Sequence, residues 1–211
     1  YSTFLTRAID QTFYDVGLHH QPVVFCLDRA GVTGDDGPSH HGVLDMVLLS
    51  KVPGMTIFAP SSYQELGVML HDALDLCTDG PAAIRWPKTA AVSVGPDEVG
   101  SGLHARKVRG GTDVCVIGVG KMLAAATEAA DLLEAEGHSV TVWDPRVVKP
   151  WDEDLITDAL AHPAVVTVED GLRDGGVGAA LADELRRRSA GGGPKVAVLG
   201  VPDGYIPHAK P

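Results

Sequence analysis

Residues 22–29 read Pro-Val-Val-Phe-Cys-Leu-Asp-Arg, and the apolar run inside this stretch decides the fold class. A short run of β-prone residues without polar alternation is typical of a strand covered on both faces, as in a parallel sheet. The elements predicted around it alternate: they are strands at 23–27, 55–59 and 82–85 and helices at 43–49 and 60–76. This alternation predicts an α/β fold built on a parallel sheet.

The first strand is preceded by a helical pattern. Apolar residues recur at helical spacing from Phe4 to Val16 and predict a helix there. Tyr1 stands directly at the start of this pattern, and Pro211 follows soon after the last predicted strand. A domain normally supplies a strand or a cap before such a helix, so we expect the chain to be a fragment of a longer protein.

A second series of strands and helices follows a glycine-rich connection. Residues 91–112 contain Gly95-Pro96 and Gly110-Gly111 and lack a helical period, so a linker is predicted there. Further strands are predicted at 113–118, 139–143, 165–168 and 195–199, and helices at 122–136, 152–161 and 178–188. The sequence therefore predicts two α/β domains, residues 1–90 with a parallel sheet and residues 113–211 with a parallel or mixed sheet.

Composition and charge limit the class of protein. The 211 residues include 17 Lys and Arg against 28 Asp and Glu, for a net charge of −11. This acidic balance argues against nonspecific binding to nucleic acids and to anionic membrane surfaces. The three cysteines form no paired framework, and no apolar run approaches the ~18 residues of a spanning helix. We expect a soluble cytoplasmic protein with neither a nucleic-acid nor a membrane partner.

Glycines in the second half match two nucleotide-binding motifs only in part. Gly118-Val119-Gly120 follows a predicted strand, but Leu123 stands where a dinucleotide fingerprint has its third glycine. Met122 follows Lys121 where a phosphate loop has Ser or Thr. We interpret these glycines as turn geometry.

The strongest local signal lies in the loop after the first strand. Residues 29–42 contain four glycines together with Arg29, the acids Asp35 and Asp36, and the imidazoles of His40 and His41. Ligands of open α/β sheets bind at the carboxyl ends of strands, and polar clusters on such loops are more often functional than structural. Adjacent histidines point apart, which disfavours a metal site. Hydrogen bonding to a hydroxylated substrate, with proton transfer by one histidine, is favoured.

Five blocks of the chain together resemble one enzyme family. They are Tyr-Ser-Thr-Phe-Leu-Thr-Arg-Ala at 1–8, Leu-Asp-Arg-Ala-Gly-Val-Thr-Gly-Asp-Asp-Gly-Pro-Ser-His-His-Gly at 27–42, Val-Pro-Gly-Met at 52–55, Asp-Gly-Pro-Ala-Ala-Ile-Arg-Trp-Pro-Lys at 79–88 and Val-Val-Lys-Pro at 147–150. In this order they resemble the 1-deoxy-D-xylulose-5-phosphate synthases, which are transketolase-like enzymes dependent on thiamine diphosphate. The resemblance implies the rear part of a pyrimidine-binding domain at 1–90 and a transketolase C-terminal domain at 113–211.

The resemblance also implies binding residues. Phe4 matches the aromatic residue that stacks on the aminopyrimidine ring of the cofactor, and Arg7 matches its basic neighbour. Tyr1, Arg29 and Lys88 match positions that hold the phosphate of glyceraldehyde 3-phosphate.

Catalytic residues are implied in the same way. Asp36 and His40 match the polar pair that contacts substrate hydroxyls and assists proton transfer. The chain departs from many relatives at Lys88, where Arg is frequent, and at His41, where Gln is common. Lysine binds phosphate as a point charge rather than as a planar fork, so the departure at Lys88 bears on substrate affinity.

The family condenses pyruvate with D-glyceraldehyde 3-phosphate to 1-deoxy-D-xylulose 5-phosphate with loss of CO₂, in the supply of isoprenoid and thiamine precursors. The resemblance implies thiamine diphosphate and Mg²⁺ as cofactors, with no metal ligands in this chain because they are expected in an amino-terminal domain outside it. It also implies a homodimer, and we expect the fragment to be inactive alone. Three alternatives stay open: a relative of transketolase, a relative of the β subunit of 2-oxo-acid dehydrogenases, and a non-catalytic dimerising module.

Overall fold

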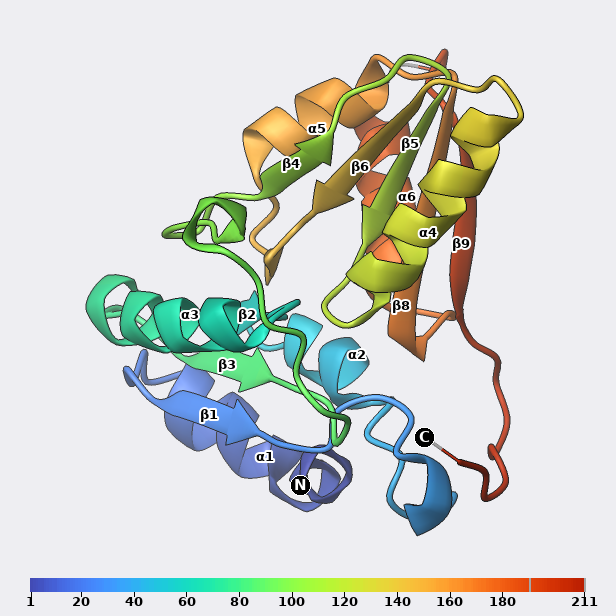
Figure 1. Ribbon diagram of the computed structural model, residues 1–211. Helices are drawn as coiled ribbons and strands as arrows, with labels where there is room; N and C mark the ends of the chain where they lie inside the picture. Colours follow the sequence, from blue (N-terminus) through green and yellow to red (C-terminus); the bar gives the residue numbers. More distant parts are fainter. Residues whose placement is uncertain (190, 211) are drawn as a thin grey trace.

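Two sheets organise the computed structural model, which describes residues 1–189 and 191–210 (Figure 1). The first sheet has the strand order β1-β3-β2-β7, and the second has the order β4-β6-β5-β8-β9. The strands of the first are β1 (Val24–Leu27), β2 (Thr56–Phe58), β3 (Ala82–Arg85) and β7 (Val147–Lys149). Those of the second are β4 (Arg106–Arg109), β5 (Val114–Gly118), β6 (Val140–Asp144), β8 (Ala164–Leu172) and β9 (Lys195–Val201). The predicted fold class, two α/β domains with sheets rich in parallel pairs, is confirmed.

The first sheet contains a strand from the second half of the chain. β1, β3 and β2 pair in parallel, as predicted, but β7 pairs antiparallel with β2. The ammonium of Lys149 on β7 donates to the carbonyl oxygens of Ser50 at 2.9 Å and Val52 at 2.6 Å, where α2 (Asp45–Ser50) ends. The second half of the chain is therefore joined to the first sheet by backbone pairing and by a helix cap.

A strand also lies within the residues for which the sequence predicts a linker. Arg106–Arg109 forms β4, which pairs antiparallel with β6 at the edge of the second sheet. Its sequence Arg-Lys-Val-Arg is mostly charged, and charged residues are the usual content of a short edge strand. Charge makes such a strand look like an irregular connection when the sequence is considered alone.

Helices cover both faces of the second sheet (Figure 1). Cys115 and Ile117 of β5 pack in one cluster with residues of α5 (Glu153–Leu160) and α6 (Val177–Arg188). Val116, between them, packs in another cluster with residues of α4 (Met122–Ala135). Because side chains alternate across a strand, covering on both faces explains why the sequence of β5 shows no polar alternation.

The first sheet is covered by α3 (Tyr63–Leu76) and by the amino-terminal helical segment. The side chain of Ser62 caps α3 by accepting from the backbone N–H of Glu65 at 3.1 Å. The amino-terminal segment is helical, as predicted, but it changes geometry along its length. It runs through a 3₁₀ helix at Ser2–Ala8, α1 (Ile9–Gln11) and a π-helical turn at Thr12–Gly17.

The length and polarity of the helices bear on whether any of them could span a membrane. Within residues 1–189 and 191–210, every helix is too short or too polar to cross a membrane.

Candidate functional site

The 3₁₀ helix places three predicted site residues in one row. In this geometry residues three apart lie above one another, so Tyr1, Phe4 and Arg7 share one side. The rings of Tyr1 and Phe4 stack with centroids 5.4 Å apart, and the Arg7 guanidinium carbon lies 5.6 Å from the centroid of Phe4. The Phe4 side of this row faces solvent, because the residue is 42% exposed.

The glycine-rich loop is closed at its base by backbone hydrogen bonds. Gly31 and Gly42 exchange N–H donors at 3.0 and 2.8 Å, and the Ala30 N–H donates to the Trp86 carbonyl beyond β3 at 2.9 Å. A Cβ at Gly42 would lie 2.5 Å from both the Arg29 carbonyl oxygen and the Ser2 hydroxyl, so glycine is required there. The loop thus leaves the carboxyl end of β1 on a rigid base, as predicted.

Arg29 links the aromatic row, formed by Tyr1 and Phe4, to the glycine-rich loop. Its guanidinium carbon lies 4.0 Å from the centroid of Tyr1, within the range of a cation–π contact. Its Nε lies 3.7 Å from a carboxylate oxygen of Asp36, and its Nη1 donates to Asp28 at 2.6 Å. Asp36 in turn accepts from Lys88 Nζ at 2.8 Å.

Lys88 also donates to Asp35, at 2.7 Å. The hydrogen bonds that Lys88 donates to Asp35 and Asp36 raise the pKa of Lys88, and the bond that Asp35 accepts from Lys88 lowers the pKa of Asp35. Lys88 and Asp35 are therefore charged at neutral pH.

The two adjacent histidines point in different directions, as predicted. His40 lies against the aromatic row, with ring centroids 5.5 Å from Phe4 and 6.2 Å from Tyr1, and its Nδ1 lies 2.9 Å from the Ser39 hydroxyl. His41 is buried, and its Nδ1 accepts from the backbone N–H of Thr33 at 3.0 Å. Only His40 is therefore placed to exchange a proton with a ligand on the aromatic row.

All seven residues predicted for the site belong to one connected set of contacts. They are Tyr1, Phe4, Arg7, Arg29, Asp36, His40 and Lys88. The set combines an exposed aromatic face, three cations, one carboxylate and one imidazole. It can hold a flat ring, an anionic group and a hydroxylated chain side by side.

A buried ion network below the site was missed by the sequence analysis. Arg85 donates to Asp45 at 2.9 Å and to Asp170 at 2.6 Å, and all three side chains are at most 3% exposed. Lys121 lies 3.7 Å from the second oxygen of Asp170. Arg85 ends β3, Asp45 begins α2 and Asp170 lies on β8, so the network joins the two sheets. The available signal was Arg85 itself, a charge at the end of an apolar strand, where ionised residues are rarely buried unless paired.

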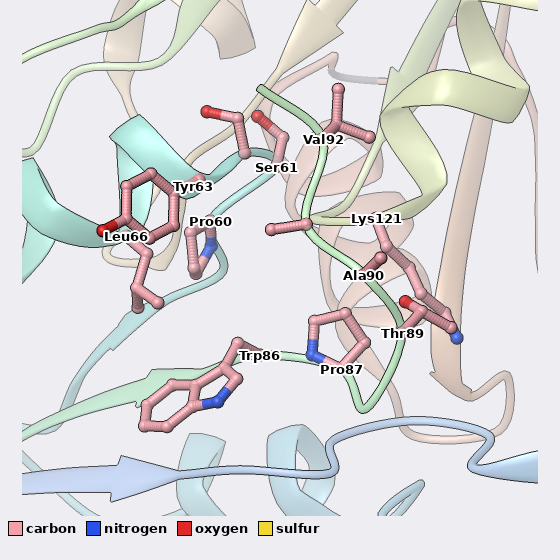
Figure 2. Close-up of a pocket in the computed structure, with 12 residues that line it drawn as sticks. Pro60, Ser61, Tyr63, Leu66, Trp86, Pro87, Thr89, Ala90, Val92 and Lys121 are labelled. Carbon is pink, nitrogen blue, oxygen red and sulfur yellow. The ribbon is translucent and has the colours of Figure 1, made fainter. Parts of the chain in front are cut away.

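A cavity of about 260 Å³ lies beside this network but outside the connected set (Figure 2). Figure 2 shows Trp86 and Leu66 towards one end and Thr89 and Lys121 towards the other. None of the seven predicted residues lines it. We therefore assign the candidate site to the exposed row and loop rather than to this cavity.

Potential metal ligands do not gather in the described part of the chain. Residues 1–189 and 191–210 contain no group of three or more His, Cys, Asp or Glu side chains placed to hold a metal ion. The exposed Phe4 ring, with a cation beside it, fits a flat heteroaromatic ring. A metal–diphosphate group therefore finds no ligand set among the described side chains.

Family models match both halves of the chain. Residues 1–92 match the transketolase pyrimidine-binding domain, and residues 103–211 match the transketolase C-terminal domain.

Curated relatives match over nearly the whole chain. The 1-deoxy-D-xylulose-5-phosphate synthase of Anaeromyxobacter dehalogenans is 48% identical over 100% of the chain and 34% of its own length. The synthase of Magnetococcus marinus is 42% identical over 99% of the chain and 34% of its length. The chain thus spans about a third of the length of the curated relatives that it matches.

Solved structures agree on the fold. A split-gene transketolase, described as an inactive β4 tetramer, aligns with a TM-score of 0.85 and 29% identity over 96% of this chain and 65% of that one. A transketolase variant from Pichia stipitis aligns with a TM-score of 0.77 and 15% identity over 100% of this chain and 30% of that one, which supports the fold alone.

Proposed function

The chain belongs to the transketolase family, and from this premise we propose that it forms the acceptor-binding part of a 1-deoxy-D-xylulose-5-phosphate synthase. The reaction is the condensation of pyruvate with D-glyceraldehyde 3-phosphate, with loss of CO₂. The curated relatives that cover the chain carry this name, and they support the assignment over a generic transketolase. Because the chain spans about a third of their length, activity requires a further portion that binds the diphosphate. We call the two portions together the complete enzyme.

The connected set of seven residues carries the proposal. Arg29 and Lys88 supply the positive charge that an acceptor phosphate needs at one end of the loop. Asp36 lies between these cations, where its carboxylate can accept from a substrate hydroxyl. His40 lies over the aromatic row, where its imidazole can pass a proton to or from the reacting oxygen.

The aromatic row is the proposed binding site for the aminopyrimidine ring of thiamine diphosphate. When bound, this cofactor stabilises the negative charge left by loss of CO₂. Phe4 offers an exposed face for its aminopyrimidine ring, and Arg7 lies beside that face. We place Mg²⁺ and the diphosphate on the portion of the complete enzyme outside this chain, since the described side chains offer no metal ligand set.

Domain boundaries, assembly and location are part of the same proposal. We propose a pyrimidine-binding domain at 1–90, a connection at 91–112, which includes the edge strand β4, and a C-terminal domain at 113–211. We further propose a cytoplasmic homodimer. Exposed apolar residues of the amino-terminal segment, Tyr14 and Leu18, offer a surface for self-association, and sedimentation of the complete enzyme as a monomer would contradict the dimer.

The test combines intact mass with an activity assay. The intact molecular mass of the purified protein is measured. CO₂ release is then measured with pyruvate, thiamine diphosphate, Mg²⁺ and glyceraldehyde 3-phosphate. Release that depends on glyceraldehyde 3-phosphate and falls at least about 100-fold in His40→Ala supports the proposal. Turnover with a ketose-phosphate donor in place of pyruvate would identify a transketolase instead.

A second candidate is a subunit that completes a partner chain. The similarity to a split-gene transketolase supports it, since the alignment covers 96% of this chain and 65% of that one. In that case a 22.1 kDa chain is inactive alone and gains activity when a separate diphosphate-binding chain is added.

A further inference from the structure

Lys88 is paired with two carboxylates although it stands in the proposed phosphate site. Its ammonium donates to Asp35 at 2.7 Å and to Asp36 at 2.8 Å. A lysine ammonium has three N–H donors, so two of them are in use. A phosphate that binds Lys88 through two oxygens must therefore replace one of these carboxylates.

Asp35 is the carboxylate that is easier to replace. Its side chain is 68% exposed, and among the described residues its single ion pair is with Lys88. Asp36 is 28% exposed and also lies 3.7 Å from Arg29, so its displacement would break two contacts with cations. The Asp35 carboxylate is already largely hydrated, so rotation of its side chain away from Lys88 into the solvent costs little free energy.

The charge balance of the loop makes this replacement matter. Three cations, Arg29, Lys88 and the terminal ammonium of Tyr1, face three carboxylates, those of Asp28, Asp35 and Asp36. An incoming dianion therefore meets a site with no excess positive charge. A ligand carboxylate that replaces Asp35 exchanges one monoanion for another and gains little, whereas a phosphate brings more charge and three acceptor oxygens.

We propose that Asp35 is a specificity-determining residue of the phosphate subsite, which competes with the acceptor phosphate for Lys88. Its carboxylate weakens the binding of every anion at Lys88 and leaves the contacts to the reacting aldehyde untouched. The residue therefore sets the KM for the phosphorylated acceptor. This inference rests on the proposed function, because it takes Arg29 and Lys88 as the phosphate-binding pair.

The experiment measures steady-state rates of the complete enzyme at saturating pyruvate, with glyceraldehyde 3-phosphate or unphosphorylated glyceraldehyde as the acceptor. The variants are Asp35→Asn, Lys88→Met and the double variant, with Asp35→Ala as a second removal of the charge. Asp97→Asn is the matched control, because Asp97 is an exposed acid in the 3₁₀ helix Pro96–Glu98 and its removal changes the net charge equally.

We expect Asp35→Asn to lower the KM for glyceraldehyde 3-phosphate about 3- to 10-fold with little change in kcat. The kcat/KM for unphosphorylated glyceraldehyde should stay constant. In Asp97→Asn the KM for glyceraldehyde 3-phosphate and the kcat/KM for glyceraldehyde should both stay constant. In the Lys88→Met background the effect of Asp35→Asn should disappear, because the cation for which it competes is gone.

Two results overturn the inference in distinguishable ways. If Lys88→Met raises the KM and Asp35→Asn and Asp35→Ala do not lower it, Asp35 is not a competitor, while the proposed function stands. If neither Lys88 nor Asp35 affects the KM, the phosphate does not bind at this pair, and the proposed site fails together with the inference.

Discussion

The imidazole of His41 joins the glycine-rich loop to the segment that follows the last strand, through a 3.2 Å hydrogen bond from its Nε2 to the carbonyl oxygen of Ile206. The Thr33 N–H donates to Nδ1 on the other side of the ring, so the proton of the neutral imidazole is on Nε2. Ala209 adds a second tie by donating to the Gly34 carbonyl at 3.3 Å. The segment after β9 therefore lies over the loop that carries Asp36 and His40 (Figure 1).

Replacement of His41 separates its bridging role from its bulk. His41→Leu leaves the Thr33 N–H and the Ile206 carbonyl without their partner and is expected to lower the free energy of unfolding by about 1–3 kcal/mol. His41→Gln keeps one acceptor and one donor and should lose less than about 1 kcal/mol. Urea unfolding and amide hydrogen exchange of the loop measure both effects. Equal stability of the two variants would contradict the bridge.

The buried position of Arg85 predicts a large stability effect. Arg85→Met leaves buried Asp45 without its cation and buried Asp170 with Lys121 at 3.7 Å, and it should cost about 3–5 kcal/mol. Arg109→Met is the control, because its partners Asp131 and Glu134 lie on the surface, and it should cost less than about 1 kcal/mol. Denaturant unfolding of both variants gives the comparison, and similar losses would show that the buried network adds no more than a surface pair.

Two buried acids predict how stability depends on pH. Burial raises the pKa of Glu169 to about 7 and the pKa of Asp144 to about 6. Between the unfolded value of about 4.3 and pH 7, folded Glu169 holds a proton that the unfolded chain has lost. The free energy of unfolding should therefore fall as pH rises through this window, by at most about 1.4 kcal/mol per pH unit for one group, and level off above it.

Glu169→Gln tests this dependence, because it removes the titrating group and should flatten the slope between pH 5 and 7. The comparison is urea unfolding at pH 5, 6, 7 and 8 beside Glu128→Gln, which removes an exposed acid from α4. An unchanged slope in Glu169→Gln would assign the titration to another group.

The exposed face of Phe4 predicts a cofactor effect without a stability effect. In the complete enzyme Phe4→Leu should raise the thiamine diphosphate concentration for half-maximal activity about 3- to 10-fold, the usual value of an aromatic stacking contact. The free energy of unfolding should change by less than about 1 kcal/mol, because the residue is 42% exposed. Tyr63→Leu, which alters a 66% exposed aromatic residue of α3 outside the connected set, should leave the cofactor requirement unchanged. A shift of equal size in both variants would argue against stacking on Phe4.

Local patterns of the sequence determined the elements of both sheets that carry apolar runs. β5 and its parallel neighbour β6 were predictable because burial on both faces produces a continuous apolar segment. β1 carries a similar apolar run, but the prediction that both of its faces are covered was wrong, because β1 is an edge strand and Cys26 is exposed. The candidate site was found in the same way, since a polar glycine-rich loop after such a strand is visible in one stretch of residues. The resemblance to a family then selected seven residues, which the structure brings into contact.

Tertiary structure alone decided the pairings between distant residues. β7 joins β2 across about 90 positions of chain, and Arg85 meets Asp170 across 85, yet neither partner carries a local mark of the other. The 3₁₀ geometry that aligns Tyr1, Phe4 and Arg7 is likewise invisible in a pattern that fits an α-helix equally well. The physical reason is that the spacing of apolar residues shows which side of a helix or strand is buried. Which distant strand or side chain it contacts depends on the free energy of the whole packed fold.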